Sequence, residues 1–162
     1  MRIMLAAVLG AALVTPGAFA AAAPNVPVPA HCDAAVNAQL ARLVAQHHAG
    51  AVDNVMVCGT TFAPSRPQRP GPHGGHQLIP LRAPTGPGQS ILVEVVTNDD
   101  LDGARVTAPR GARVIAFGQY FKTTGGQRPF VAGVHEVHCA THRGADNGWV
   151  VVNGTKFPDI RC

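Results

Sequence analysis

The chain has 162 residues, of which 46% are hydrophobic, 14% charged and 5% aromatic, and its formal net charge is +4. This length predicts one compact domain and excludes a large multidomain enzyme. The 18 glycines and 14 prolines follow no fixed period, which excludes a collagen-like chain. The composition also excludes a coiled coil and an acidic disordered tail, but it indicates no particular activity.

The first twenty residues have the three parts of a secretory signal peptide. Residues 1–2 form a basic start, residues 3–14 form an apolar run, and Ala18-Phe19-Ala20 is a small-x-small cleavage pattern. The run is shorter than the roughly 20 apolar residues that span a bilayer, and no later stretch is apolar enough to act as a stable membrane anchor. We therefore expect a signal peptide over residues 1–20, cleaved near Ala20, and a secreted or periplasmic protein.

All four cysteines lie in the part expected to be exported. An even number of cysteines in an oxidising compartment predicts two disulfides. We expect the pairs Cys32–Cys58 and Cys139–Cys162, because each joins elements that are close in the sequence, although spacing alone leaves the other pairings open. The alternative, a thiolate metal site, lacks the Cys-x-x-Cys spacing that is typical of such sites.

One amphipathic helix is predicted near the start of the exported part. Asp33 can serve as its N-cap, and apolar residues recur with helical spacing from Val36 onward. Gly50 can end the helix. These signals predict a helix over roughly residues 34–48.

The pattern after the helix is typical of strands. Residues rich in β-branched side chains alternate with Gly/Pro turns at 52–62, 76–82, 90–97, 112–121, 130–139 and 149–153. In the second of these strands, Pro80 favours an edge position or a bulge. Short strands with regular turns indicate a mainly β protein, built as a small barrel or sandwich. We expect a flexible lead-in over residues 21–30 and a single disulfide-stabilised β domain over residues 31–162.

Residues 64–75 form the one low-complexity segment. Three prolines recur at a spacing of three residues, which favours polyproline II. Its functional interpretation is a peptide ligand or a basic lip that uses Arg66 and Arg69. We favour the simpler interpretation, a mobile hairpin loop between the first two strands.

Five of the eight histidines fall in two groups. His73 and His76 begin the second predicted strand, whereas His135, His138 and His142 lie on the fifth strand and its exit. In an extended chain His138 and His142 share one face, and His135 lies on the other. His76, His138 and His142 are therefore candidate metal ligands, for zinc above all. The simpler interpretation is that these imidazoles hydrogen-bond turns and backbone carbonyls.

A second group of polar residues follows the third predicted strand. Asp99, Asp100 or Asp102 would supply a carboxylate to a metal site. Paired acids also act as general acid and base, so Asp99 and Asp100 are candidate catalytic residues. Because Asn and Asp are also common turn formers, we favour a turn at this position.

Eleven of the thirteen basic residues are arginine, which suits bidentate contacts to phosphate or carboxylate. Phe117, Tyr120, Phe121 and Trp149 can stack on bases or sugars. The net charge falls from +4 to +3 if Arg2 is removed with the signal peptide, so nucleic-acid binding is only weakly indicated. No P-loop, nucleophile elbow or Rossmann fingerprint is present, which disfavours a covalent hydrolase.

Short segments of the chain resemble, in order, the exported bacterial family catalogued as domain of unknown function 3465. The segments are Gly74-Gly-His-Gln77, Thr97-Asn-Asp-Asp-Leu101, Phe117-Gly-Gln-Tyr120, His138-Cys-Ala-Thr-His142 and Gly148-Trp149. The resemblance covers roughly residues 45–155. It implies an OB-like barrel of five to six strands preceded by one helix, and no settled activity. The His-rich motif of the family is degenerate here, since Cys139-Ala140 replaces its tryptophan.

We therefore expect an exported OB-like module that binds an oligonucleotide, an oligosaccharide or another anionic polymer. Its expected ligand-binding residues are His76, Gln77, Asn98, Tyr120, His138, His142 and Trp149. One alternative is a metal-dependent nuclease or phosphodiesterase that uses the histidines for the ion and Asp99 or Asp100 for water. Another is a structural or inhibitory envelope protein that binds its partner through residues 64–75.

Overall fold

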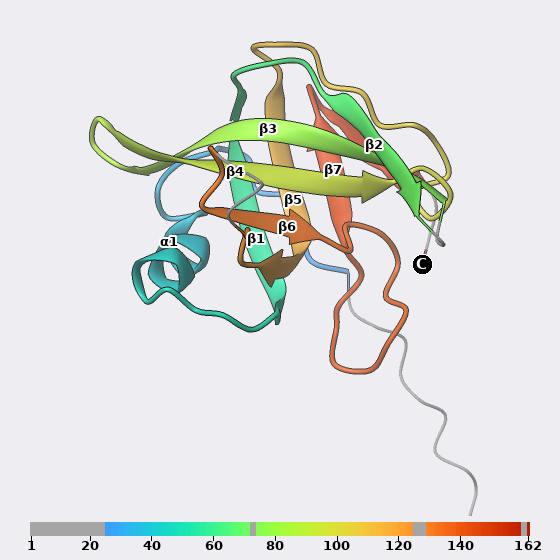
Figure 1. The fold of residues 1–162 in the computed structure, drawn as a ribbon, viewed down its shortest axis with the longest axis horizontal. Coiled ribbons are helices and arrows are strands. Elements are labelled where there is room, and N and C mark those ends of the chain that lie inside the picture. The colour runs from blue at the N-terminus through green and yellow to red at the C-terminus, as the bar shows by residue number, and fades with distance from the viewer. Residues whose placement is uncertain (1–24, 72–73, 125–128, 160–161) are drawn as a thin grey trace, which may run out of the picture.

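The computed structural model describes residues 25–71, 74–124, 129–159 and 162 (Figure 1). The predicted signal peptide over residues 1–20 lies outside the described residues, as does His73. The elements, in chain order, are α1 (Ala38–Ala45), β1 (Val52–Thr61), β2 (Arg66–Gly71), β3 (Gly74–Gly86), β4 (Gln89–Asn98), β5 (Arg113–Phe121), β6 (Ala132–His135), β7 (Trp149–Val152) and β8 (Thr155–Phe157).

Five of these strands close into a barrel. Their order around the ring is β1, β3, β4, β6 and β5, and β5 pairs with β1 to complete it. The β4–β6 pair is parallel, and the other four pairs are antiparallel. Along the chain, β5 is the fourth of the five barrel strands, and it pairs with the first, β1. This is the strand order of a Greek key. The predicted mainly β, OB-like barrel with a preceding helix is confirmed.

Alternating side chains fill the barrel, as the twofold period of a strand requires. Val55 and Val57 of β1, together with Val93 and Val95 of β4, are completely buried in the main core. A second, smaller apolar cluster lies on the opposite face of β1, β5 and β7. It consists of Cys58, Ile115, Phe117, Trp149 and Val151, with Val26, Cys32, Val36 and Met56 packed against it. The segment before α1 therefore covers one outer face of the barrel.

The helix is shorter than predicted at both ends. Asp33 Oδ1 accepts hydrogen bonds from the N–H groups of Ala35 and Val36, at 2.9 and 3.1 Å, so it caps a turn that precedes α1. At the other end, the His47 N–H donates to Val44 O and the His48 N–H donates to Leu43 O. His47 has φ 51°, and this pattern is a Schellman motif. The helix therefore ends before Gly50 is reached.

Pro80 lies in the middle of β3, so the expectation of an edge or a bulge there was wrong. It is buried opposite Glu94 of β4, in regular register. Its carbonyl accepts a hydrogen bond from the Phe62 N–H at 3.2 Å, on the side of β3 that faces away from β4. The pairing along that side changes from β1 to β2 near Pro80. The backbone N and O of one strand residue point to the same side of the strand. The nitrogen of Pro80 therefore also faces away from β4, and its missing N–H removes no hydrogen bond to β4.

The proline-rich segment is largely a strand, so the prediction of a mobile loop was wrong for residues 66–71. These residues form β2, which pairs antiparallel with β3 and places Gln68 opposite His76. Within the described sheet β2 pairs with β3 alone, and such an edge position tolerates proline. Strand β8 was not predicted. Strand β6 is shorter than predicted, and the chain leaves it at Glu136, which has φ 52°.

Both predicted disulfides are confirmed. Cys32–Cys58 joins the segment before α1 to β1, and Cys139–Cys162 joins the loop after β6 to the C-terminal residue. Two disulfides indicate an oxidising compartment. In the part of the chain that the structure describes, no helix has the length and apolar character needed to cross a membrane.

The described part of the expected lead-in is held against the barrel. Asn25 forms a parallel bridge with Asn147, and the Val26 carbonyl accepts a hydrogen bond from the Trp149 indole N–H at 2.9 Å. These contacts fix residues 25–26 beside β7.

Candidate functional site

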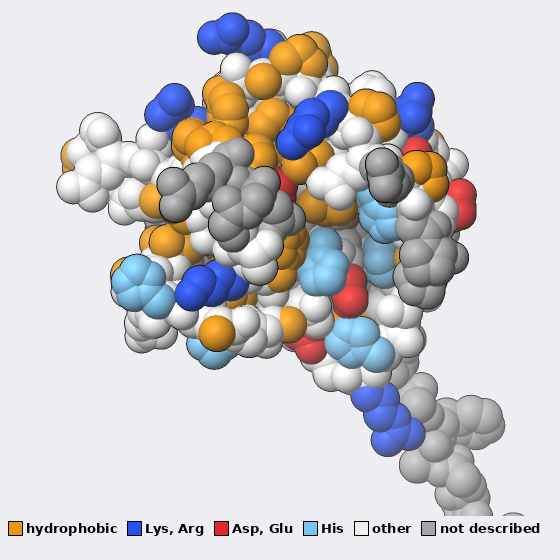
Figure 2. Space-filling model, in the orientation of Figure 1, with side chains coloured by type: hydrophobic (Ala, Val, Ile, Leu, Met, Phe, Trp, Pro, Cys, Tyr) orange, Lys and Arg blue, Asp and Glu red, His pale blue; other side chains and the backbone are white. Residues whose placement is uncertain are grey.

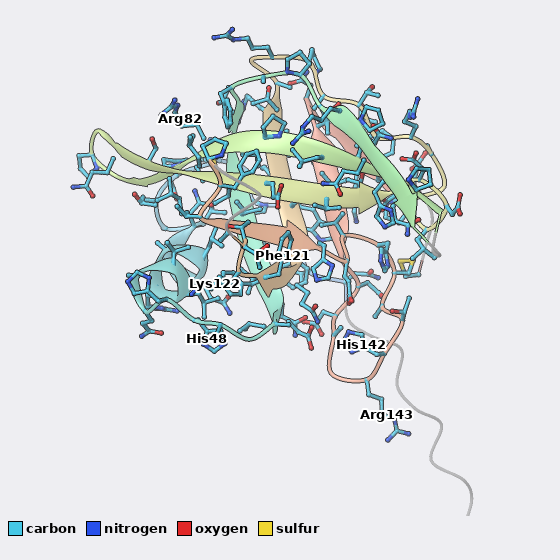
Figure 3. All side chains as sticks on the ribbon, in the orientation of Figure 1. His48, Arg82, Phe121, Lys122, His142 and Arg143 are labelled. Carbon is cyan, nitrogen blue, oxygen red and sulfur yellow. A yellow bond between two sulfur atoms is a disulfide. The ribbon has the colours of Figure 1, made fainter. Side chains whose placement is uncertain are left out.

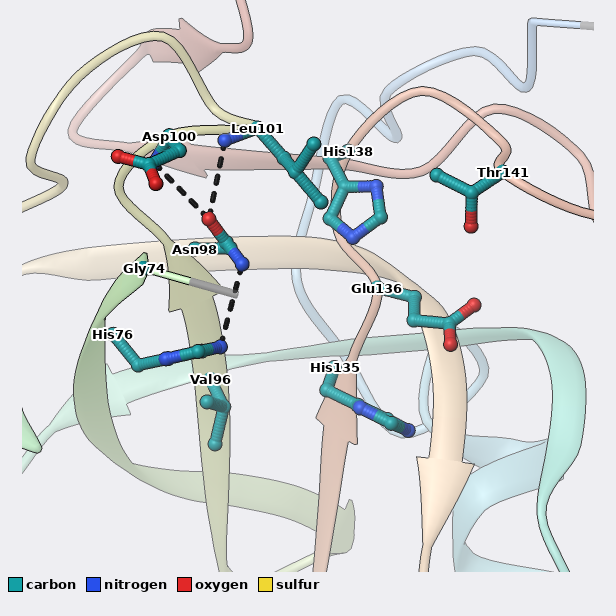
Figure 4. A pocket seen from close by; sticks show the side chains of 10 residues that line it. All are labelled: Gly74, His76, Val96, Asn98, Asp100, Leu101, His135, Glu136, His138 and Thr141. Atoms are coloured by element: carbon teal, nitrogen blue, oxygen red, sulfur yellow. Dashed lines mark hydrogen bonds between the residues drawn. The ribbon is translucent and has the colours of Figure 1, made fainter. Parts of the chain in front are cut away.

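A cleft of about 720 Å³ opens at one end of the barrel, where β4 and β6 separate. The parallel register of these two strands ends with the pair Val95–Val134. Past this pair, the side chains of both strands border an open space. The lining residues are Gly74, His76, Val96, Asn98, Asp100, Leu101, His135, Glu136, His138 and Thr141 (Figure 4). Figure 2 shows histidine side chains gathered around this hollow, with acidic side chains between them.

Three of the predicted ligand-binding residues lie together in the cleft. They are His76 on β3, Asn98 at the end of β4 and His138 after β6. Asn98 Oδ1 accepts hydrogen bonds from the N–H groups of Asp100 and Leu101, at 3.0 and 3.1 Å, as an Asx turn does. This fixes the amide so that Asn98 Nδ2 faces His76 Nε2 at 3.4 Å, which makes that imidazole nitrogen the acceptor (Figure 4).

A backbone contact fixes the proton position on His138. Its Nδ1 lies 2.9 Å from the carbonyl oxygen of Cys139, and a carbonyl only accepts, so Nδ1 carries the hydrogen. In the neutral ring Nε2 is then an acceptor. His138 lines the cleft and is 7% exposed, so this nitrogen is its candidate acceptor for a ligand with an O–H or N–H group.

His135 also lines the cleft. A chain of polar contacts that the sequence analysis did not predict holds its ring in place. Asp53 Oδ1 accepts from Gln119 Nε2 at 2.6 Å, and Gln119 Oε1 lies 2.8 Å from His135 Nε2. Because the carboxylate only accepts, the amide orientation is set, and His135 Nε2 must donate. Burial lowers the pKa of His135, which favours the neutral ring with an acceptor at Nδ1.

Strand alternation predicted His135 and His138 on opposite faces, but the backbone between them brings both to the cleft. Glu136 has φ 52°, so the chain is not extended between the two histidines. The Phe121 ring packs edge-on against the His135 ring, with centroids 5.1 Å apart. Phe121 therefore supports the wall of the cleft.

Gln77 and Asp99 are hydrogen-bonded to each other, and neither lines the cleft. Gln77 is 2% exposed, and its amide donates to Asp99 Oδ2 at 3.0 Å. The guanidinium of Arg105 lies 3.7 Å from the same carboxylate oxygen. Asp100 lines the cleft and Asp99 does not, so the structure separates the two candidate catalytic acids.

The two predicted aromatic ligand-binding residues belong to the barrel interior and the second apolar cluster. Tyr120 and Trp149 are each 1% exposed. The Tyr120 hydroxyl donates to the His48 carbonyl at 2.9 Å, and the Trp149 ring lies 6.1 Å from that of Phe117. Neither ring offers a surface on which a base or a sugar can stack.

His142 lies at the rim, beside two carboxylates, rather than with His76 and His138. Its Nε2 is 3.0 Å from Glu136 Oε2 and 3.8 Å from Asp53 Oδ1, and its Nδ1 lies 3.1 Å from the Arg143 carbonyl. Figure 3 labels His142 and Arg143 on the loop that follows β6. The Arg143 carbonyl and the Glu136 carboxylate raise the pKa of His142. Among the described residues, Asp53, Glu136 and His142 are the one set of three whose potential metal-ligand atoms lie within 4.8 Å of one another.

Asp102 supports the turn that carries Asn98 and is expected to make stability depend on pH. It is 2% exposed, and its Oδ2 accepts from the Asn98 N–H at 2.8 Å. Burial raises the pKa of Asp102 to about 7, partly offset by this hydrogen bond. Between about pH 4 and 7 the unfolded chain ionises this group while the folded chain keeps it protonated, so stability falls as pH rises. Asp102→Asn should reduce the difference in unfolding free energy between pH 5 and pH 8 by about 2 kcal/mol.

Denaturant unfolding at the two pH values tests this expectation. Asp159→Asn, at an exposed position, is the matched control and should leave the pH dependence unchanged. An Asp102→Asn variant with the full pH dependence of the parent protein would show that another group is responsible.

Comparison with protein-family models, with curated proteins and with solved structures found no match. The family resemblance drawn from short sequence segments therefore stays a prediction. The fold and the cleft define the class of this protein as a small, disulfide-bonded β-barrel with a histidine-lined cleft at one end.

Proposed function

We propose that this protein is an exported OB-like binding module whose cleft takes an oligosaccharide. The observation that carries the proposal is the chemistry of the cleft wall. The ten lining residues that the structure describes supply three imidazoles, two carboxylates, one amide and one hydroxyl, and none of these ten is Lys or Arg. The predicted signal peptide and the two disulfides support a secreted or periplasmic location.

The wall is rich in hydrogen-bond acceptors. His135 Nδ1 and His138 Nε2 accept in the neutral tautomers assigned above, and the carboxylates of Asp100 and Glu136 accept only. Sugar hydroxyls supply the matching donors, while Val96 and Leu101 offer apolar contact to their C–H faces. The same wall would place the phosphates of an oligonucleotide beside two carboxylates, and its described residues supply no Lys or Arg to offset them. An oligosaccharide is therefore favoured over the other polymers suggested by the sequence.

Titration of the oxidised protein with neutral cell-wall oligosaccharides tests the proposal, with single-stranded DNA as the comparison. We expect saturable binding of a glycan and none of DNA. His76→Ala removes one hydrogen-bonding group from the wall and should weaken glycan binding about tenfold, which corresponds to about 1.4 kcal/mol. His31→Ala, at an exposed position outside the cleft, is the matched control.

Two outcomes would contradict the proposal. Saturable binding of DNA without binding of any glycan would favour the oligonucleotide alternative. Cleavage of either polymer during the titration, dependent on an added divalent metal, would favour the hydrolase alternative, for which Asp100 is the candidate acid at the cleft.

A further inference from the structure

We propose that Asp53, Glu136 and His142 form a binding site for one zinc ion at the rim of the cleft. This inference goes beyond the proposed glycan binding and does not depend on it. One of the three side chains comes from β1 and the other two come from the segment that follows β6, and one ligand atom of each lies within 4.8 Å of the others.

Local backbone features bring the first carboxylate to the site. The β1–β5 register shifts between Val52 and Val55, so the intervening residues leave the regular alternation of the strand. Such bulges redirect side chains. Asn54, in this bulge, accepts a hydrogen bond from the Asp146 N–H at 2.8 Å and donates one to the Gly144 carbonyl at 3.3 Å. The loop that carries His142 is thereby fastened to the strand segment that carries Asp53.

Neighbouring protein groups orient two of the three ligands, as such groups do in known metal sites. His142 Nδ1 donates to the Arg143 carbonyl, which leaves Nε2 as the nitrogen that faces the two carboxylates. A metal-bound histidine commonly donates its other ring N–H to a backbone carbonyl in this way. Gln119 Nε2 donates to Asp53 Oδ1 and holds that carboxylate in place. His142 and Asp53 therefore each have a partner outside the set that fixes the orientation of the ligand, while Glu136 contacts His142 itself.

The donor set favours zinc over calcium, magnesium and manganese. One imidazole nitrogen and two carboxylates are ligands that zinc accepts in a four-coordinate site with three protein ligands and one water. Calcium and magnesium prefer oxygen ligands throughout, and manganese binds more weakly than zinc to a given set of ligands. The His142 side chain is 39% exposed and those of Asp53 and Glu136 are 32% and 29% exposed, so the fourth position is open to solvent.

The other cleft histidines do not belong to this site. His76 Nε2 faces the Asn98 amide, and His138 Nδ1 donates to a backbone carbonyl. Neither belongs to a described set of three ligands with the required spacing. This difference provides a matched comparison, because His138 is an imidazole that borders the same recess as Asp53 and Glu136 without being a proposed ligand.

Titration of the oxidised full chain with zinc chloride, without any glycan, tests the proposal. We expect one ion per chain by calorimetry and a selective change in the imidazole NMR signals of His142. His142→Ala should weaken binding at least about tenfold, and Asp53→Asn should weaken it in the same direction. His31→Ala and His138→Ala should leave the affinity unchanged. Cobalt(II) bound in place of zinc should give a visible spectrum that is lost in His142→Ala.

Three outcomes would overturn the proposal. They are no stoichiometric zinc binding, unchanged affinity in a folded His142→Ala variant, or loss of affinity in His138→Ala with His142→Ala unaffected. Circular dichroism of each variant establishes that it is folded. Because metal binding and glycan binding are measured separately, failure of one leaves the other test intact.

Discussion

Replacing Asn37 with alanine is expected to lower the free energy of unfolding by about 5 kcal/mol. Asn37 is completely buried between β1 and β3. Its Nδ2 donates to the carbonyls of Cys58 and Pro84, at 3.1 and 2.9 Å, and its Oδ1 accepts from the Cys58 N–H at 2.7 Å. The β1–β3 pairing includes Thr60 and Thr61 but not Cys58, so this amide replaces the missing strand contacts. Alanine would leave these three backbone groups without the amide, and the two of Cys58 are buried.

Two further variants sharpen this test by denaturant unfolding with the disulfides intact. Asn37→Asp keeps an acceptor for the Cys58 N–H but loses both donors, so it should be at least as destabilising at neutral pH. Gln46→Ala, at an exposed position just after α1, should change the free energy of unfolding by less than about 0.5 kcal/mol. A loss below 1 kcal/mol in Asn37→Ala would show that water replaces the amide at small cost.

The strands of the barrel were predictable where local pattern and tertiary environment agree. Five of the eight residues 90–97 are apolar, and the segment lies in β4, which has a neighbour on each side. β2 was not predictable in this way, because its prolines disfavour a strand and only pairing with β3 makes it one. Pro80 was misjudged for a related reason, since tolerance of proline depends on which side its nitrogen faces, and the sequence does not show that side.

The candidate site was predictable in part. His76, Asn98 and His138 stood out as polar residues at or near the ends of predicted strands, and they do lie together. Asp53 was missed because a bulge that redirects one residue leaves no periodic signal. Tyr120 and Trp149 were assigned to a ligand because composition does not separate a buried aromatic ring with a satisfied polar group from an exposed one.

Gly148→Ala is expected to lower the free energy of unfolding by about 4 kcal/mol and to disturb the cleft. A Cβ on this buried residue would collide with the Glu136 carbonyl oxygen and would lie 2.9 Å from Phe117 O and 3.0 Å from His138 N. All three are backbone atoms, so no side-chain rotation relieves the contact. The segment that would have to move carries His135, Glu136 and His138, all of which line the cleft.

Stability and site geometry should therefore change together in this variant. Denaturant unfolding measures the stability, and the imidazole NMR signals of His135 and His138 report on the geometry of the cleft. Gly50→Ala is the matched control, because its Cβ would meet only His48 Nε2 at 3.4 Å, an ordinary contact. It should retain the parent stability to within about 1 kcal/mol. Parent-like stability in Gly148→Ala would mean that the exit of β6 adapts without loss of packing, and the cleft would then be less rigid than its backbone contacts indicate.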